Sequence, residues 1–378
     1  MCAEQKIIHP EEYRQGLEKW LTDAARRGPV MFVHGSTLKR LDTFRQMLDK
    51  ITMEHGIKLI PFSDYQANPR YESVEKGAAL FNANHCGAIM AVGGGSAIDV
   101  AKCIKLFSNM DPAKNYLEQT IVPNDIPFLV MPTTSGTGSE ATRYAVIYYN
   151  GVKQSVTHAS CIPDTVIFDP AALKTLPAYQ KKATMMDAFC HALESFWSVN
   201  STEESRGYSR DAIRLVLENM DAYLENREEG NEKMLLASYI AGKAINITQT
   251  TAGHAMCYKI TSLFGTAHGH SAALCDRVLF PRMISDMDHC IDPRGEEYLQ
   301  GVLEEIAHAM GCSNAEKAAK RFNAIFDSLE LPVPEATAEQ FAELRTSVNP
   351  IRLKNHPVAL DEETIDSLYH QILKEKAS

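Results

Sequence analysis

The feature that most constrains the fold is an alternation of short apolar runs with Gly-rich turns and helix-length segments in the first half of the chain. Five runs have the composition of buried strands, at 30–35, 57–62, 88–95, 127–132 and 165–170. Helical patterns lie between several of them, at 70–84 and 97–108 for example. Because parallel strands are joined by crossover helices, this half is predicted to be α/β, with a parallel sheet flanked by helices.

Two segments depart from that alternation. Residues 145–159 alternate around Asn150-Gly151, which predicts an inserted antiparallel hairpin. After Pro177 the strand signals nearly vanish and helix-length periodic segments follow, at 205–224, 232–249, 296–310, 314–329 and 362–376. A chain of 378 residues suits two domains of roughly 100–200 residues each, so we predict domains at 1–180 and 181–378, the second all-helical.

Composition excludes several partners. The net charge is −10 and no Lys/Arg cluster is present, so we expect no nucleic acid partner. No stretch approaches the ~20 apolar residues that a membrane helix needs, and residues 1–15 lack the apolar core of a secretory signal. Nine cysteines, starting at Cys2, occur without CxxC pairs, which predicts reduced thiols and a cytoplasmic location with no membrane contact.

Two glycine loops follow consecutive apolar runs. In "AVGGGSAIDVAK", Gly94, Gly95 and Ser96 open a helix, and free N–H groups at a helix start attract phosphate. The pattern is not GxGxxG, and alone it is equally consistent with a tight turn. The second loop, "MPTTSGTGSEAT" at 131–142, again offers small hydroxyl residues. Two loops at neighbouring strand ends define a crevice where a dinucleotide pyrophosphate fits, so residues 1–180 are predicted to bind a dinucleotide.

The first strand bears on the choice of dinucleotide. It is followed by Gly35, Ser36 and Thr37, with no acid among them. An acid at this position would bind the ribose 2′-hydroxyl and repel a 2′-phosphate. Lys39 and Arg40 lie close by. The segment therefore favours NADP(H) over NAD(H); the alternative is that both cations are only solvated helix charges.

The helical half contains acid and imidazole groups in apolar runs. Asp187 and His191 are four residues apart and share one helix face, and His254 and His268 follow in a second apolar segment. One carboxylate and three imidazoles suit a first-row divalent ion, Fe²⁺ or Zn²⁺. Any one of these histidines alone would be read as a satisfied core residue, but the four together predict a metal centre in the 181–378 domain.

Four motifs resemble those of the iron-dependent (type III) alcohol dehydrogenases, namely "GGGSAIDVAK", "TTSGTGSE", "DAFCHALE" and "HAMCYKITSLFGTAHG". The resemblance runs through most of the chain. It implies a dehydroquinate-synthase-like architecture with a dinucleotide-binding α/β domain and a helical metal and substrate domain. It also implies aldehyde reduction or alcohol oxidation with NAD(H) or NADP(H), and a homodimer.

The resemblance also assigns roles by position. The metal ligands would be Asp187, His191, His254 and His268. The cofactor contacts would be Gly94, Gly95, Ser96, Asp99, Thr133, Thr134, Thr137 and Lys153.

One position departs from the family pattern. Many members carry a second histidine four residues after the one matched by His254, and here that residue is Tyr258, followed by Lys259. Tyr258 would donate a proton through its hydroxyl or merely pack. His270 lies two residues beyond His268 and so points elsewhere on a helix; we interpret it as a second-layer or substrate-side residue. The candidate catalytic residues are therefore Tyr258, Lys259 and His270.

The segment around Tyr258 also resembles phosphonoacetaldehyde reductases, which would form 2-hydroxyethylphosphonate. An anionic substrate requires cations, and Lys259, Arg143, Arg206 and Arg210 are the candidates, each of which is otherwise an ordinary surface charge. The alternatives are a reductase of neutral aldehydes or diols of the butanol, propanediol or lactaldehyde type, a dehydroquinate-synthase-like lyase, and a metal-binding protein without catalysis.

Overall fold

The computed structural model describes residues 5–376, which form two compact units. The first unit extends to Thr134 and resumes over Gly138–Leu176. The second contains the three residues Ser135–Thr137 and the chain from Pro177 onward. The second glycine loop is therefore divided between the units, which nothing in the local sequence pattern indicates.

The first unit is built on a six-stranded sheet with the order β1-β8-β5-β4-β2-β3. All of its strand pairs are parallel, with Val30 opposite Ala88 and Ile89 opposite Phe128. The strands are β1 (Lys6–Ile8), β2 (Val30–His34), β3 (Leu59–Phe62), β4 (Ala88–Gly93), β5 (Phe128–Pro132) and β8 (Thr165–Ile167). The predicted parallel α/β fold is confirmed. Strand β1 was not predicted, because three residues carry too little pattern.

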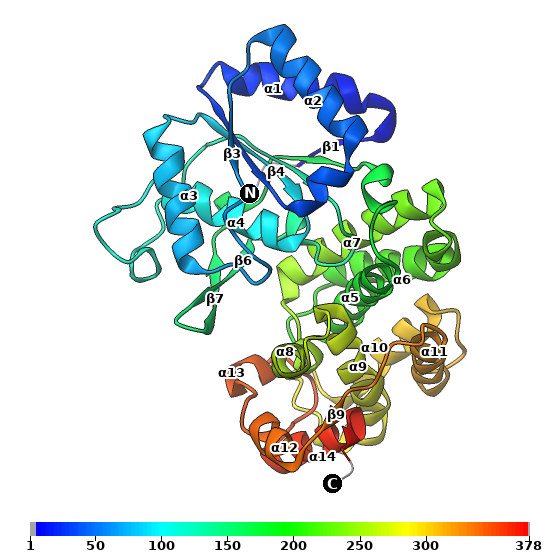
Figure 1. Ribbon diagram of the computed structural model, residues 1–378. Helices are drawn as coiled ribbons and strands as arrows, with labels where there is room; N and C mark the ends of the chain where they lie inside the picture. The colour runs from blue at the N-terminus through cyan, green and yellow to red at the C-terminus, as the bar shows by residue number, and fades with distance from the viewer. Residues whose placement is uncertain (1–4, 377–378) are drawn as a thin grey trace. The chain divides into compact units, whose positions relative to one another are not determined.

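Helices cover both faces of this sheet (Figure 1). They are α1 (Tyr13–Ala25), α2 (Asp42–His55), α3 (Tyr71–Ala83) and α4 (Gly95–Phe107). Alternate strand residues such as Phe32 and Met90 join Leu17 and Leu48 of α1 and α2 in one buried cluster. Near-continuous apolar strands are expected where both faces of a sheet are covered, and they explain why the sequence signal was clear.

The inserted hairpin consists of β6 (Tyr144–Tyr149) and β7 (Val152–Thr157), paired antiparallel. Asn150 and Gly151 both have positive φ, at 50° and 75°, as a two-residue turn of this hand requires. This confirms the predicted ribbon. Short 3₁₀ segments complete the first unit, at Pro10–Glu12, Ser36–Arg40, Tyr116–Glu118, Ser139–Ala141, Ala159–Cys161 and Pro170–Leu173.

The second unit is helical, as predicted. Its helices are α5 (Ala178–Trp197), α6 (Glu203–Leu224), α7 (Glu228–Thr248), α8 (Ala252–Phe264), α9 (His268–Ser285), α10 (Glu296–Ala309), α11 (Ala315–Ser328), α12 (Ala338–Arg345), α13 (Pro350–Leu353) and α14 (Glu362–Ile372). A short 3₁₀ turn at Met287–His289 and a two-stranded parallel pair, β9 (Glu335–Ala336) with β10 (Lys374–Glu375), complete it. Gly265, at φ 67°, ends α8 and allows His268 to begin a new helix.

The described residues contain free cysteines and no membrane-spanning helix. Eight of the nine cysteines lie in the described part of the chain and all eight are free thiols, while Cys2 lies outside it. Within residues 5–376 no helix combines the length and apolarity needed to cross a bilayer.

A buried acid in the first unit predicts a pH effect on stability. Glu140 is 1% exposed, and burial raises its pKa to about 7. Because this value lies above the ordinary 4.5, the folded state holds the proton more tightly, and the stabilisation is complete below pH 4.5 and lost as pH rises to 7. We expect Glu140→Gln to remove about 3 kcal/mol of this pH dependence, measured as the variant-minus-native difference in unfolding free energy.

The exposed acid Glu203 provides the control for that measurement. Glu203→Gln should leave the pH profile of the unfolding free energy parallel to that of the native chain. Identical profiles for native chain and Glu140→Gln would show that Glu140 is ionised in the folded protein at pH 5.

Candidate metal centre and cofactor loops

The four predicted metal ligands come from three helices of the second unit. Asp187 and His191 lie on α5, His254 on α8, and His268 is the first residue of α9. Asp187, His254 and His268 each direct one ligand atom into a group whose members are all within 4.8 Å of one another. The His191 ring stacks on the His254 ring, with centroids 4.4 Å apart and planes inclined by 17°. The structure therefore brings together all four residues that the sequence singled out.

Two of the imidazoles are oriented by groups that accept a hydrogen bond. His191 Nδ1 lies 3.1 Å from the Gly136 carbonyl, and His254 Nδ1 contacts Glu194 Oε1. Since a carbonyl oxygen only accepts, the proton of neutral His191 sits on Nδ1 and leaves the Nε2 lone pair free for a metal. Metal-binding histidines commonly donate their other ring N–H in this way. His254 Nε2 lies 3.4 Å from Asp187 Oδ1.

Glu194 is the functional residue that sequence reasoning missed. It is fully buried on α5, accepts the Thr251 hydroxyl at 2.8 Å, and accepts the His254 backbone N–H at 3.1 Å. It fixes both the ring and the backbone of His254. The only local signal was an acid in an apolar helix three residues after His191.

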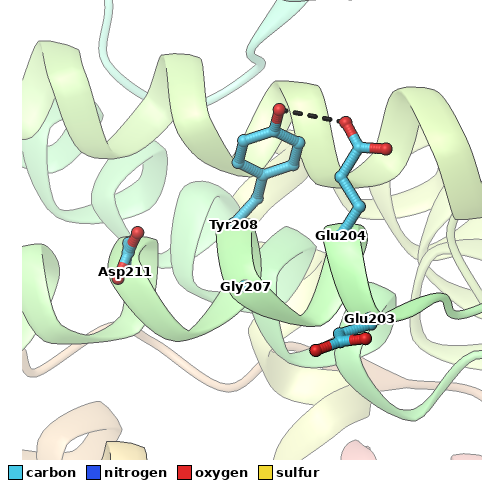
Figure 2. A pocket seen from close by; sticks show the side chains of 5 residues that line it. All are labelled: Glu203, Glu204, Gly207, Tyr208 and Asp211. Carbon is cyan, nitrogen blue, oxygen red and sulfur yellow. Dashed lines mark hydrogen bonds between the residues drawn. The ribbon is translucent and has the colours of Figure 1, made fainter.

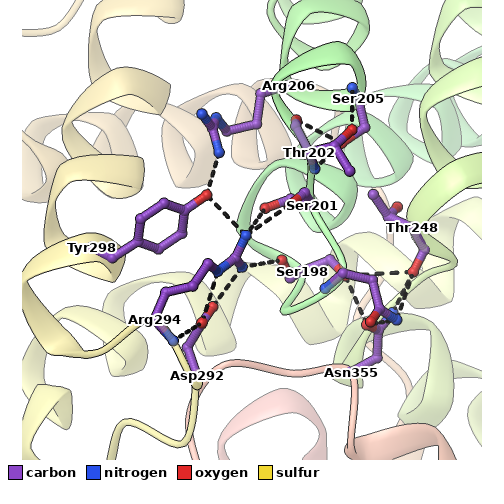
Figure 3. Close-up of polar contacts among 11 residues, drawn as sticks. Ser198, Ser201, Thr202, Ser205, Arg206, Thr248, Asp292, Arg294, Tyr298 and Asn355 are labelled. Atoms are coloured by element: carbon purple, nitrogen blue, oxygen red, sulfur yellow. Dashed lines mark hydrogen bonds and ion pairs between the residues drawn. The ribbon is translucent and has the colours of Figure 1, made fainter.

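A polar network around Asn355 holds the segment that carries Thr251, the partner of Glu194 (Figure 3). Asn355 Nδ2 donates to the carbonyls of Thr248 and Thr250, each at 2.8 Å. These carbonyls belong to the segment that leads into α8 and carries Thr251. Asn355 therefore holds the partner of Glu194 in place, and Glu194 in turn holds His254.

The electrostatics of the cluster call for a cation. Burial disfavours charge on His254, but the carboxylates of Glu194 and Asp187 outweigh it and raise the His254 pKa to about 10. Burial also opposes ionisation of Asp187, yet the three surrounding imidazoles hold its pKa below the ordinary range. The buried carboxylates of Asp187 and Glu194 are thus balanced by positive charge at His254, which either a proton or a bound metal supplies. One carboxylate and three imidazoles form a donor set that suits Fe²⁺ or Zn²⁺, so the residues present fit a divalent metal.

One member of the cluster is more exposed than the others. Asp187, His191 and His254 are at most 5% exposed, whereas His268 is half-buried. Next to His268, the Tyr258 ring lies nearly parallel, with centroids 5.5 Å apart and planes inclined by 12°. Tyr258 is therefore a neighbour of the cluster.

The other two candidate catalytic residues are engaged elsewhere. Lys259 forms an ion pair with Glu343. His270 is fully buried, its Nδ1 lies 3.0 Å from the Tyr179 hydroxyl, and burial lowers its pKa to about 4. Their assigned roles rest on the sequence alone.

The arginines proposed for an anionic substrate also have partners. Arg206 and Arg210 pair with Glu305, with closest N–O distances of 3.7 and 3.0 Å, and Arg206 also donates to the Tyr298 hydroxyl (Figure 3). Arg143 lies in the first unit with its guanidinium over the Tyr144 ring. A surface hollow on α6 is separate from the proposed ligands and is lined by Glu203, Glu204, Gly207, Tyr208 and Asp211 (Figure 2).

The predicted cofactor residues of the first unit lie after three neighbouring strands. Gly35, Ser36 and Thr37 follow β2, Gly94, Gly95 and Ser96 follow β4, and Thr133 and Thr134 follow β5. Because the strands are parallel, these ends share the carboxyl edge of the sheet, where dinucleotides bind in such folds. The Thr133 hydroxyl is buried without a hydrogen-bond partner, an observation consistent with a ligand at this edge. Thr137 belongs to the second unit, and Lys153 lies on β7.

Asp99 connects the two glycine loops. Its Oδ1 accepts the Ser139 hydroxyl at 2.7 Å and its Oδ2 accepts the Val146 N–H at 3.0 Å. One turn later on α4, Lys102 donates to the carbonyls of Thr142 and Tyr144, both at 2.7 Å. Both carboxylate oxygens of Asp99 are thus occupied by the second loop and the hairpin, so Asp99 positions the loops.

Comparison with known families decides the relationship. Residues 5–170 match the iron-containing alcohol dehydrogenase model, and residues 181–373 match the C-terminal model of the Fe-containing alcohol dehydrogenase family. The chain belongs to the iron-containing alcohol dehydrogenase family. This confirms the resemblance inferred from the four motifs.

Three relatives illustrate the range of this family. An aldehyde-alcohol dehydrogenase from Streptococcus pneumoniae is 34% identical over 262 residues, which span 65% of this chain but 30% of that protein. A phosphonoacetaldehyde reductase from Streptomyces viridochromogenes is 28% identical over 303 residues, covering 75% of this chain and 77% of the relative. The structure of sulfoacetaldehyde reductase from Bifidobacterium kashiwanohense in complex with NAD⁺ shares the fold, with a TM-score of 0.85, 24% identity and coverage of 97% and 96%.

The role of Glu194 leads to a prediction about metal affinity. Glu194→Gln would weaken the acceptor that fixes His254, and loss of such a partner typically costs 10- to 100-fold in metal affinity. We therefore expect the dissociation constants for Fe²⁺ and Zn²⁺ to rise by roughly 10- to 100-fold, measured by competition with a chelator of known affinity. Glu203→Gln on the exposed part of α6 is the control. An unchanged metal affinity in a folded Glu194→Gln variant would exclude the orienting role.

Proposed function

We propose that this chain is a metal-dependent, NAD(P)H-linked alcohol dehydrogenase that reduces a small aldehyde. The observation that carries the proposal is the convergence of Asp187, His254 and His268 within 4.8 Å, with His191 stacked on His254. Membership of the iron-containing alcohol dehydrogenase family supports the same reaction class. The roles of the two units, dinucleotide binding by the first and metal and substrate binding by the second, are part of the proposal.

The residues of the chain have distinct tasks in this reaction. A bound divalent metal supplies Lewis acidity for the carbonyl oxygen, and a reduced nicotinamide supplies hydride. Asp187 contributes negative charge to the metal site, and the Gly136 carbonyl and Glu194 keep the Nε2 atoms of His191 and His254 directed inward. Burial of these groups excludes water and strengthens every electrostatic interaction among them. Tyr258 carries a hydroxyl proton next to His268.

For the cofactor and the metal, we propose NADP(H) and Fe²⁺. Ser36 is exposed after β2, with Lys39 and Arg40 in the same 3₁₀ turn and no acid among these residues. This arrangement favours a ribose 2′-phosphate over a bare 2′-hydroxyl. The imidazole and carboxylate donors also accept Zn²⁺, so the iron assignment rests on the family.

For the substrate, we propose phosphonoacetaldehyde, reduced to 2-hydroxyethylphosphonate. The support is the phosphonoacetaldehyde reductase relative, whose alignment covers about three quarters of both chains. We further propose a homodimer, as the resemblance to the family implies, and a cytoplasmic location, because the cysteines occur without CxxC pairs.

Metal removal tests the reaction class. We expect protein stripped of ions to lose NADPH-dependent reduction of phosphonoacetaldehyde and propanal by more than about 100-fold, because the carbonyl loses several kcal/mol of charge stabilisation, and Fe²⁺ to restore it. Asp187→Asn should not be restored, whereas the exposed Asp211→Asn should behave like the native chain. Full activity of stripped protein would refute the metal dependence. Turnover without net consumption of NADPH would indicate the lyase alternative.

An acid placed after β2 tests the cofactor assignment. Ser36→Asp would set a carboxylate against the 2′-phosphate, and like charges in contact cost several kcal/mol. We expect KM for NADPH to rise by roughly tenfold or more while KM for NADH changes by less than about threefold. The isosteric Ser36→Asn is the control and should affect both cofactors little. Equal changes with both cofactors would place the 2′-phosphate elsewhere.

A further inference from the structure

We propose that Arg352 binds the acid group of the substrate, so that the enzyme takes aldehydes carrying a tetrahedral oxyacid, a phosphonate or a sulfonate. The inference rests on the proposed aldehyde reductase function and names a residue and a substrate class for that site. Arg352 was not among the residues that the sequence suggested.

The position of Arg352 is defined by two contacts within the second unit. It lies on α13, and its Nη1 donates to the Tyr258 hydroxyl at 3.2 Å. Its guanidinium carbon is 5.0 Å from the centre of the Tyr258 ring, and that ring is 5.5 Å from the centre of the His268 ring. The guanidinium is therefore separated from a proposed metal ligand by the width of one aromatic side chain.

Exposure also groups these residues. Asp187, His191 and His254 are buried, whereas His268, Tyr258 and Arg352 are half-buried. Tyr258 and Arg352 therefore lie next to the most exposed of the proposed metal ligands.

Charge distinguishes Arg352 from the other cations considered. Lys259 pairs with Glu343, and Arg206 and Arg210 pair with Glu305. Among residues 5–376 no ion pair is found for Arg352. A guanidinium has five N–H donors in a fork that suits two oxygens of one acid, and only one donation, to Tyr258, is accounted for.

Tyr258 links Arg352 to the cluster. Its ring is 5.5 Å from the centre of the His268 ring, and its hydroxyl accepts from Arg352 Nη1 at 3.2 Å. Tyr258 then acts as a positioning residue, because its hydroxyl and its ring hold the guanidinium in place.

The experiment compares three aldehydes of similar size: phosphonoacetaldehyde, sulfoacetaldehyde and propanal. For Arg352→Ala we expect KM for both anionic aldehydes to rise roughly 10- to 100-fold, the effect of losing charge-assisted hydrogen bonds, with a smaller change in kcat. KM for propanal should stay within about twofold. Arg352→Lys keeps the charge without the fork, and its KM values for the anionic aldehydes should lie between those of the native enzyme and those of Arg352→Ala. The native acid group, phosphonate or sulfonate, is that of the anionic aldehyde for which the native enzyme has the higher kcat/KM.

Two controls separate this inference from the proposed function. Arg345→Ala removes a cation paired with Glu362 and should leave all three KM values unchanged. Calorimetric titration with methylphosphonate, which has no carbonyl, should give binding to the native protein and none to Arg352→Ala.

The outcomes are distinguishable. Equal loss with all three aldehydes, or methylphosphonate binding unaffected in both Arg352→Ala and Arg352→Lys, would overturn the anion site while leaving the reductase function standing. Failure of the native enzyme to reduce any aldehyde, with methylphosphonate still bound through Arg352, would overturn the function and leave the anion site.

Discussion

The helical unit depends on the neutralisation of a buried carboxylate. Asp187 is 2% exposed, and removing a charge from water costs several kcal/mol unless an opposite charge is near. Three imidazoles from α5, α8 and α9 supply that charge or share a cation with it. These helices can approach closely because Gly253 and Gly269 lack side chains: a Cβ on Gly269 would lie 2.2 Å from the Ala183 carbonyl, and one on Gly253 would lie 2.0 Å from Asp276 Oδ1. Gly253, which precedes His254, and Gly269, which follows His268, are thus as constrained as the histidines themselves.

Two further buried acids, Glu194 and Asp276, differ in protonation because their surroundings differ. Burial works against ionisation of Glu194, but the His254 charge and hydrogen bonds from Thr251 hold its pKa below the ordinary value. Burial and the neighbouring Glu194 charge raise the Asp276 pKa well above its usual range. Adjacent carboxyl groups in a dry site commonly separate in this way. Glu194 therefore carries the negative charge that orients His254, and Asp276 remains neutral.

Local pattern predicted much of the fold and the residues of the candidate metal centre that lie close together, but not the long-range pairings. Buried strands are apolar runs, and helix-spaced Asp187 and His191 are visible as a pair in the sequence. In contrast, Glu194 reaches Thr251 57 residues away, and Arg352 reaches Tyr258 94 residues away. Lys259 was proposed as the substrate cation because its charge is visible and its pairing with Glu343 is not. The transfer of Ser135–Thr137 to the helical unit likewise follows from tertiary contacts that no local rule describes.

Burial also distinguishes three of the four residues proposed to hold the metal, which are buried, from Arg352, proposed to select the substrate, which is half-buried. Replacing any of Asp187, His191 or His254 leaves an uncompensated charge or an unsatisfied polar group in a dry environment, which is strongly destabilising. Replacing the half-buried Arg352 leaves the Tyr258 hydroxyl free to bond to water, which costs far less. Substitutions at Arg352 and Tyr258 are therefore expected to change the class of aldehyde without loss of the proposed metal site. Proteins that share this buried cluster are then expected to share the reaction and to differ in the residues beside His268.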